Sequence, residues 1–428
     1  MTKSVCMFVW NHFTNDARVL RECTALSESG YNVDLICIDD PSDEKLKKHE
    51  VFNENFHVYR VRRYPVILEK LNSIFRFVKK QKWFLLIIAS LWLFSLYNYL
   101  YPTLIITAMF ALIYNSKFRA LWIRSNIFFR MVGKGYLKKY DVYHANDLNT
   151  LMQGYICAKW RIKRRKLIYD SHEVQTSRTG YDSPIHGKLE AFLIKKIDSM
   201  IVENDTRAKY NEDLYGFYPN VIHNYPFKKN SEVTELIDLH EKLNLPPSEK
   251  ILLYQGGIQI GRGLEKLLEA VPLFKEGTLV FIGDGKQKPE LLKYVEENNL
   301  QSCVKFIPKV PLQDLPKYTG SAYLGFQVLN NICFNHWSAS SNKLFEYMMG
   351  KVPVIACSFP EIKKVVTSEN VGICVDSHDP IDIARGVNEL LIDIDKRNRM
   401  SENCWKAKEK YNWENEKQIL LNIYGNVL

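Results

Sequence analysis

The sequence lacks several features that mark well-known functional classes. None of its nine cysteines forms a Cys-x-x-Cys pair, and Cys6, Cys37 and Cys357 lie inside apolar runs of strand type. This usage excludes a disulfide framework and a structural zinc site, and it predicts reduced thiols in a cytosolic protein. The apolar stretch 5–10 is too short for a secretory signal, so we expect none. No glycine-rich loop ends in Lys-Ser or Lys-Thr, so we do not expect ATP hydrolysis.

Acidic residues are scarce between positions 51 and 139. There, 15 Lys and Arg stand against only Glu54 and Glu69, so this segment carries +13 while the rest of the chain carries −3 of the net +10. A basic surface so localised favours a polyanionic partner, either a nucleic acid or an anionic membrane.

Charge is absent altogether from Trp83 to Ser116, a run of 34 residues flanked by cations such as Lys80 and Lys117. One spanning helix needs ~20 apolar residues and a spanning pair needs more than ~40. Because cations flank both ends, both ends are expected on the cytoplasmic side. We predict a helical hairpin, or two interfacial helices, broken by Pro102 into pieces of about 18 and 12 residues. The alternative is a buried core helix pair; the run favours a membrane over nucleic acid.

The N-terminal half alternates strands and helices. A strand over Ser4–Trp10 precedes a helix over 16–29 with apolar residues at helical spacing, Gly30 stops that helix, and a second strand covers Val33–Ile38. A βαβ opening predicts a parallel sheet. Further strands of this half are expected at Val58–Val61, Val142–His144, Lys166–Tyr169 and Met200–Glu203.

A second series of alternating strands and helices begins near residue 250, after a linker that starts at Tyr225. The pattern predicts two α/β, doubly wound domains, 1–225 and 226–408, followed by a helix over 409–428. Ligands of such domains bind at the carboxyl ends of the strands, facing a cleft. The expected strands are Lys250–Tyr254, Thr278–Ile282, Val304–Ile307, Ala322–Phe326 and Val352–Ala356.

Glycine-rich turns follow two strands of this second series. Gly256 and Gly257 come directly after one strand, and Arg262 lies between two glycines that open the next helix. Glycines let backbone N–H groups approach an anion, and an arginine adds a bidentate donor for a diphosphate. A plain tight turn is the alternative. A similar turn around Gly283 contains Asp284, for which we favour a structural role.

The run from Ser338 to Met348 carries the most information. Small hydroxyl residues lead into a helix on which Lys343 and Glu346 stand three residues apart. In a nucleotide site the carboxylate would accept the ribose hydroxyls and the lysine would meet phosphate. A surface ion pair between the two is the alternative.

Polar residues crowd two strand ends of the N-terminal half, at 141–147 and 169–173. His144, Asp147, His172 and Glu173 are residue types that bind metals, but their spacing matches no known ligand pattern. We therefore predict no metal, and a lone histidine such as His144 is as often structural as catalytic.

Taken in order, these segments resemble the retaining, nucleotide-sugar-dependent glycosyltransferases of family 4, which have the GT-B fold. The resemblance covers nearly the whole chain. The segments that carry it are NDARVLRECTALSESGYNVDLI, DVYHANDLNTL, LIYDSHE, YQGGIQIGRGLEKLLEA, FIGDG, SNKLFEYMMGKVPVIA and YNWENEKQILLNIY.

The resemblance implies a role for each matching residue. Arg262 would meet the donor diphosphate, Glu346 would bind the ribose hydroxyls, and both would act in catalysis together with His144. The other donor-binding residues would be Gly256, Gly257, Gly283, Lys309, Val310, Ser341, Asn342, Lys343 and Leu344. The acceptor side would be lined by Asn11, Asn15, Asn146, Asp147, His172 and Glu173.

The implied reaction is transfer of a hexosyl-type sugar, with retention, from a UDP- or GDP-sugar to a lipid-linked saccharide or surface polysaccharide. It would need no cofactor or divalent metal and would take place at the cytoplasmic face of the membrane, with monotopic association and no nucleic acid. Three positions depart from the family: Ser338 replaces the first of two glutamates, Gly257 replaces an arginine, and Asn146 replaces a histidine. A catalytically inactive scaffold of the same fold, docked on the membrane, is therefore the alternative.

Overall fold

A computed structural model describes residues 3–14, 16–43, 45–175, 184–228 and 235–428. Its contacts divide the chain into two compact units. The first comprises Met1–Asp170, Lys195–Asp198 and Leu428, and the second comprises Ser171–Ile194 and Ser199–Val427.

The first sheet is parallel except at one edge. Its order is β3-β4-β2-β1-β5-β6-β7-β8, and the edge strand β3 is antiparallel to its neighbour β4. The order changes direction between β1 and β5, which pair directly with Phe8 opposite Ala145. The strands are β1 (Ser4–Phe8), β2 (Asn32–Ile38), β3 (His49–Asn53), β4 (Phe56–Val61), β5 (Val142–Asn146), β6 (Lys166–Ser171), β7 (Ser199–Val202) and β8 (Asn220–Val221).

Helix α1 (Ala17–Glu28) confirms the helix predicted over 16–29. The Asp16 side chain caps it by accepting a hydrogen bond from the Val19 N–H, and Gly30 leaves the helical conformation with a φ of 86°. The remaining helices of the first unit are α2 (Val66–Lys80), α3 (Lys82–Asn98), α4 (Leu100–Tyr114), α5 (Ser116–Leu137) and α6 (Leu148–Lys159).

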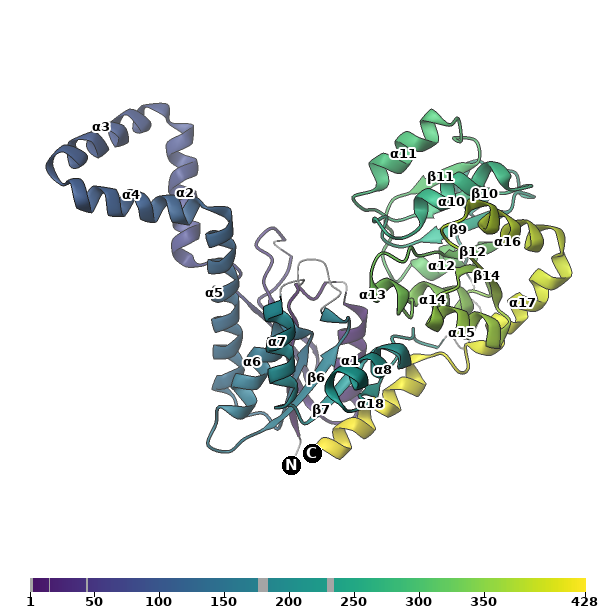
Figure 1. Cartoon of the computed structure of the whole chain (residues 1–428), viewed down its shortest axis with the longest axis horizontal. Helices are drawn as coiled ribbons and strands as arrows, with labels where there is room; N and C mark the ends of the chain where they lie inside the picture. The colour runs from purple at the N-terminus through teal and green to yellow at the C-terminus, as the bar shows by residue number, and fades with distance from the viewer. Residues whose placement is uncertain (1–2, 15, 44, 176–183, 229–234) are drawn as a thin grey trace. The chain divides into compact units, whose positions relative to one another are not determined.

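Helices α2 to α5 form an insert between β4 and β5, and α3 and α4 stand away from the sheet (Figure 1). The predicted break in the apolar run is present, but it lies at Tyr99 because Pro102 sits in the first turn of α4, where proline is tolerated. Hydrogen bonds join the two helices, from Trp92 to Thr107 at 2.9 Å and between the hydroxyls of Ser95 and Thr103 at 2.6 Å. The two helices therefore form a hairpin.

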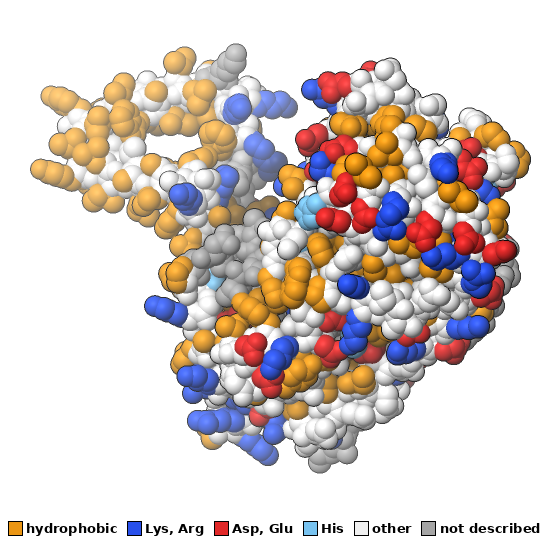
Figure 2. Space-filling view, turned by 45° about the vertical axis from the view of Figure 1, so that its right-hand side comes forward, with side chains coloured by type: hydrophobic (Ala, Val, Ile, Leu, Met, Phe, Trp, Pro, Cys, Tyr) orange, Lys and Arg blue, Asp and Glu red, His pale blue; other side chains and the backbone are white. Residues whose placement is uncertain are grey.

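Most large apolar side chains of α3 and α4 are exposed, including Leu86 at 72% and Phe94 at 66%. The alternative of a buried core helix pair does not describe them. Figure 2 shows these hydrophobic side chains covering the protruding helices. Among the described residues no single helix is both long and apolar enough to cross a membrane. The pair α4 and α5, bent by 75°, meets the same length and composition criteria together.

Helix α5 carries the chain from this hairpin back to the sheet, where it packs on α6, β2 and β4. Its approach is close, since a Cβ at Gly135 would lie 2.5 Å from the Phe8 ring.

The second sheet is parallel in the order β11-β10-β9-β12-β13-β14. Numbered along this sheet the order is 3-2-1-4-5-6, which is the order of a doubly wound dinucleotide-binding fold, with its direction changing between β9 and β12. Its strands are β9 (Ile251–Gln255), β10 (Thr278–Ile282), β11 (Val304–Ile307), β12 (Leu324–Gln327), β13 (Val354–Cys357) and β14 (Gly372–Val375).

Alternate residues of these strands pack into two separate cores, one on each face of the sheet. Leu252 and Tyr254 belong to one core, while Ile251 and Leu253 belong to the other. Helices α10 (Leu264–Ala270), α11 (Lys288–Glu297) and α16 (Pro380–Ile392) contribute to the first core, and α14 (Asn342–Met349) and α15 (Pro360–Glu369) contribute to the second.

The remaining helices of the second unit complete its surface and its ends. They are α7 (Pro184–Ile194), α8 (Asp205–Tyr215), α9 (Leu239–Leu243), the 3-10 turn η2 (Val271–Leu273), α12 (Leu315–Thr319), α13 (Phe334–Trp337), α17 (Ile394–Ala407) and α18 (Trp413–Val427). Helix α18 is fixed at its start by Glu416, which accepts from the His223 N–H at 2.7 Å.

Candidate functional site

The loops after β9 and β10 touch through their backbones. The Gly256 N–H donates to the Ile282 carbonyl at 2.9 Å, and Gly256 has a φ of 125°. Gly283 has a φ of 153°, and a Cβ there would lie 1.9 Å from the Gly256 carbonyl oxygen. Only glycine fits both the conformation and the space at Gly283. These predicted donor residues therefore form one compact turn pair at the carboxyl ends of neighbouring strands.

Lys343 lies against this turn pair from the first turn of α14. Its Nζ is 3.1 Å from the Tyr254 hydroxyl and 4.2 Å from the centre of that ring. Burial and then the nearby Arg262 guanidinium lower the pKa of Lys343 to about 7, while Glu346 acts in the opposite direction. Two cationic groups thus gather beside the glycines, which is the arrangement that a diphosphate group requires.

Glu346 is held by a short chain of side chains. Its Oε2 accepts a hydrogen bond from Gln255 Nε2 at 2.7 Å, and Gln255 Oε1 accepts in turn from Thr319 Oγ1 at 2.7 Å. Lys343 and Glu346 each have a hydrogen-bond partner of their own, and Glu346 also acts electrostatically on Lys343. The carboxylate is oriented by its neighbours, as a hydroxyl-binding group needs to be.

The other residues predicted for the donor site at the start of α14 differ in their burial and in their hydrogen-bond partners. Ser341 precedes the helix and donates to Gln327 Oε1 at 2.8 Å. Asn342 Oδ1 is buried and has no hydrogen-bond partner within the described ranges. Leu344 packs in the core at 1% exposure, and its N–H donates to the Ser341 carbonyl at 3.1 Å. Asn342 is therefore the residue here with an unused acceptor.

Lys309 and Val310 follow β11 next to the Gly283 turn. The Lys309 N–H donates to Asp284 Oδ2 at 3.0 Å, and Asp284 also pairs with Lys288 at 2.6 Å. The hydrogen bond from Lys288, followed by that from Lys309, lowers the pKa of Asp284. Asp284 joins two loops, which agrees with the structural role predicted for it. Val310 packs against the core.

Three of the predicted acceptor residues, Asn11, Asn146 and Asp147, lie in the first unit near the carboxyl ends of β1 and β5. Asn11 Nδ2 donates to Asp16 Oδ2 at 2.7 Å, and the Phe13 N–H donates to Asn11 Oδ1 at 2.8 Å. Asn146 is buried and donates to the Phe8 carbonyl at 2.9 Å. Asp147 follows with a φ of 62°. The predicted residue Asn15 lies outside the described residues.

His144 is completely buried in a charged cluster. Its Nε2 lies 3.8 Å from Asp170 and 3.9 Å from Glu22, and Arg18 lies 2.9 Å and 3.0 Å from the same two carboxylates. His144, Glu22 and Asp170 could supply ligand atoms within 4.8 Å of one another. The Arg18 guanidinium offsets one of the two carboxylate charges, and the prediction of no metal stays a prediction. A catalytic role for His144 stays a prediction.

His172 and Glu173 fall in the second unit. The His172 carbonyl accepts a hydrogen bond from the buried Arg207, which also donates to Ser338 Oγ at 3.2 Å and pairs with Glu203. Ser338 is completely buried, and its carbonyl accepts from Asn204 at 2.7 Å. Ser338, which replaces a glutamate of the family, is therefore part of an internal hydrogen-bond network with Arg207 and Asn204.

Comparisons with known proteins agree with this geometry. Residues 237–407, which include all the donor residues named above, match the family model "Glycosyl transferases group 1". Residues 237–407 therefore form a domain of the group 1 glycosyltransferases. This glycosyltransferase is 22% identical over 308 residues to a D-inositol 3-phosphate glycosyltransferase of Xylanimonas cellulosilytica, covering 67% of this chain and 72% of that one. It is 25% identical over 305 residues to an uncharacterized glycosyltransferase of Methanocaldococcus jannaschii, covering 67% and 75%.

Solved structures confirm the predicted fold class of this glycosyltransferase. Sucrose-phosphate synthase from Thermosynechococcus elongatus aligns with a TM-score of 0.71 at 15% identity, covering 99% of this chain and 98% of that one. HepE of Anabaena, solved in complex with UDP, aligns with a TM-score of 0.69 at 15% identity, covering 99% and 100%. The fold is GT-B, with two Rossmann-like domains.

Sequence reasoning about this glycosyltransferase missed several residues of the site. Tyr254 ends a predicted strand and Gln255 follows it, and no role was predicted for either, although their polar groups reach Lys343 and Glu346. Arg207 lies in a helix whose spacing gave no sign of burial. The available signal for Gln255 was its place directly after the predicted strand Lys250–Tyr254, where polar residues face the ligand.

Proposed function

We propose that this glycosyltransferase transfers a hexosyl-type sugar, with retention of configuration, from a UDP- or GDP-sugar to a lipid-linked saccharide or surface polysaccharide. The observation that carries the proposal is the group around α14. Lys343 and Arg262 provide positive charge next to the glycine turn, the N-terminal turn of α14 faces the same place, and Glu346 is an oriented carboxylate on that helix. A nucleoside diphosphate sugar needs both features, one for its phosphates and one for its ribose.

The catalytic residues in this proposal are Arg262, Glu346 and His144. Charge developing on the leaving diphosphate would be stabilised by Arg262, by Lys343 and by the positive end of α14 rather than by a metal ion. With no enzymatic nucleophile among the proposed residues, the acceptor hydroxyl would attack from the side that the diphosphate leaves. No cofactor is required for this chemistry.

The apolar hairpin supports a membrane-proximal acceptor. Lysines and arginines flank it, and in the described part of the chain several of them form no ion pair with a carboxylate. Those cations are Lys70, Arg76, Lys79, Lys80, Lys117 and Arg119. Exposed apolar helices next to unpaired cations are the features of monotopic binding to an anionic leaflet, which we place on the cytoplasmic face.

The alternative function is a membrane-docked scaffold without turnover. Two observations favour it: Gly257 carries no charge, and Ser338 is occupied by Arg207 rather than open to a sugar. Failure of the purified chain to bind any UDP- or GDP-sugar in calorimetry would favour this alternative.

Release of nucleotide from a panel of UDP- and GDP-sugars tests the site. We expect Glu346→Ala and Arg262→Ala to lower turnover by about 100-fold or more, because each removes a charged contact to the donor. Glu290→Ala and Arg399→Ala are matched controls, since both side chains are exposed on other helices of the same unit. Unchanged turnover in both Glu346→Ala and Arg262→Ala would contradict the assignment of these residues to the donor site.

A further inference from the structure

A pocket of about 310 Å³ opens in the first unit beside helix α5. It is not lined by any residue that the proposed reaction uses. Its lining residues are Trp10, Arg124, Ser125, Phe128, Phe129 and Asn149. Four of these come from α5, one follows β1 and one lies in the first turn of α6.

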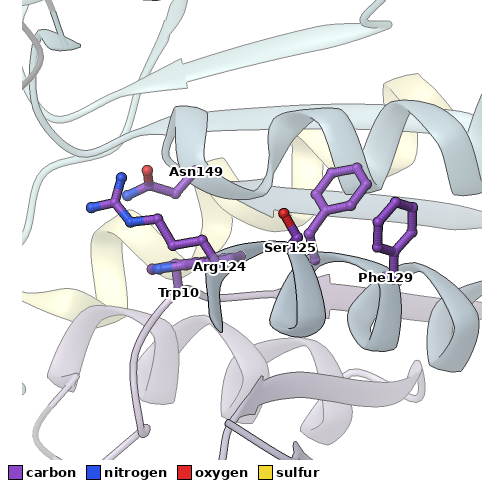
Figure 3. Close-up of a pocket in the computed structure, with 6 residues that line it drawn as sticks. Trp10, Arg124, Ser125, Phe129 and Asn149 are labelled. Atoms are coloured by element: carbon purple, nitrogen blue, oxygen red, sulfur yellow. The ribbon is translucent and has the colours of Figure 1, made fainter. Parts of the chain in front are cut away.

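The pocket is polar at one end and aromatic at the other. Figure 3 shows the Arg124 guanidinium and the Asn149 amide together at one end and the Phe129 ring at the opposite end. No acidic residue lines the pocket, and Arg124 forms no ion pair with any carboxylate in the ranges that the structure describes. Phe129 is 70% exposed, so its ring is available to a ligand. The pocket therefore suits a ligand with an anionic head group, which would contact Arg124, and an apolar chain, which would contact the aromatic end.

The position of the pocket connects two parts of the first unit. Trp10 and Asn149 follow β1 and β5, between which the strand order changes direction, and ligands of open α/β sheets bind at such points. Trp10 also directly precedes Asn11, a predicted acceptor residue. On its other side, α5 continues through a 75° bend into the apolar helix α4. A chain lying along α5 would thus lead from the hairpin toward the strand ends.

We propose that this pocket binds the phosphate group and first chain segment of a lipid, and that this phosphate-bearing lipid is the carrier of the acceptor. Arg124 and Asn149 hold the phosphate, and Phe128 and Phe129 contact the methylenes that follow it. The identification of the lipid as acceptor rests on the proposed function, whereas the binding site itself does not.

The lining residues favour a lipid phosphate over other anions. A free phosphate would meet a single arginine, and the aromatic wall would contribute nothing to the binding of a small hydrated ion. An apolar chain without a phosphate would leave Arg124 unused. Both halves of the pocket are satisfied only when head and chain belong to one molecule.

Calorimetric titration of the full chain with dodecyl phosphate below its micellar concentration tests the site. Inorganic phosphate represents the head alone, and dodecyl maltoside represents the chain with a neutral head. We expect dodecyl phosphate to bind, with inorganic phosphate failing to compete at equal concentration. Arg124→Gln should weaken binding about tenfold or more, because a charge-assisted contact is lost. Phe129→Ser should weaken it as well.

Arg130→Gln is the matched control, because Arg130 is exposed six residues later on α5 and does not line the pocket. Its affinity for dodecyl phosphate should stay within twofold of that of the unchanged protein. Equal losses in Arg124→Gln and Arg130→Gln, or equal competition by inorganic phosphate, would overturn the site in favour of a diffuse basic surface or a simple anion site. Circular dichroism of each variant checks that it is folded.

Donor binding separates this proposal from the proposed function. Arg124→Gln should bind UDP- or GDP-sugars as the unchanged protein does, because its pocket contains no donor residue. If dodecyl phosphate binds through Arg124 while no nucleotide-sugar binds at all, the pocket stands and the transferase proposal fails. If donors bind and dodecyl phosphate does not, the pocket proposal alone is overturned.

Discussion

At the residue scale, burial beside Arg262 lowers the pKa of Lys343 to about 7 from an ordinary value of 10.5. A lysine that meets the donor diphosphate must carry its proton, and the free protein loses that proton as the pH rises through 7. We therefore expect the affinity for a nucleotide-sugar to fall about tenfold between pH 7 and pH 8.5 in calorimetric titrations.

Lys343→Gln should bind the donor more weakly at pH 6 and should lose this dependence on pH. A nucleotide-sugar is the right ligand for the test, because its diphosphate has no secondary ionisation in this interval. The same slope in Lys343→Gln as in the unchanged protein would mean that another group titrates.

Arg207 is the buried residue on which the Ser338 network depends. It donates to Ser338, to the carbonyls of His172 and Asn335, and to Glu203. Arg207→Met leaves these acceptors buried without their donor, so we expect a loss of about 3–5 kcal/mol in the free energy of unfolding, measured with urea. Lys209→Met on the same helix, where the side chain is exposed, should change it by less than about 0.5 kcal/mol. Similar values for the two variants would contradict the network.

At the element scale, two glycines respond in opposite directions to alanine. A Cβ at Gly283 would lie 1.9 Å from the Gly256 carbonyl oxygen, so Gly283→Ala must displace the donor turns. We expect a loss of about 2 kcal/mol or more in stability together with weaker donor binding. Gly133 lies inside α5 with nothing within 4 Å of a Cβ, so Gly133→Ala should stabilise the protein by up to about 1 kcal/mol. Thermal denaturation of both variants would detect a reversal of these signs.

The hairpin of α3 and α4 is the element that we expect to hold the protein on a membrane. Helix α3 has 17 residues and is therefore ~25 Å long, shorter than the ~30 Å hydrocarbon core. Leu86→Glu combined with Phe94→Glu should abolish flotation of the full chain with vesicles that contain anionic lipid. Leu292→Glu, an exposed position on α11 in the other unit, should leave flotation unchanged. Flotation of the double variant at the level of the unchanged protein would contradict the role of the hairpin.

Most elements could be predicted from the sequence because their apolar runs are bounded by turns. The strands Thr278–Ile282 and Val304–Ile307 match β10 and β11 at both ends. Strand β3 was missed because its side chains are mostly exposed and polar, so it shows no apolar alternation. Strand β14 was missed because Gly372 and Cys374 weaken a run of only four residues.

The donor site could be predicted further than its supporting contacts. Glycine turns and the run at 338–348 have local signals, since glycine and helix-capping residues act at short range. The hydrogen bond from Gln255 to Glu346 joins residues 91 positions apart, and that from Arg207 to Ser338 joins residues 131 positions apart. No local pattern encodes such pairs, because they depend on how the strands and helices pack.

At the scale of the whole molecule, the two units divide the proposed reaction between them. The second unit contains the residues proposed for the nucleotide-sugar, and the first contains the hairpin, the pocket and most of the residues proposed for the acceptor. The net charge follows the same division, since the segment 51–139 of the first unit carries +13. Loss of the hairpin or of the pocket should therefore leave donor binding intact.

The central claim is that the second unit binds a nucleotide-sugar at Glu346 and Arg262. The most direct measurement is a thermal shift of the full chain across UDP- and GDP-sugars, repeated with Glu346→Ala. We expect at least one of these nucleotide-sugars to stabilise the unchanged protein, by about 2.7 kcal/mol at 100 times its dissociation constant. The Glu346→Ala variant should lose this stabilisation. Absence of stabilisation by every nucleotide-sugar, or equal stabilisation of Glu346→Ala, would contradict it.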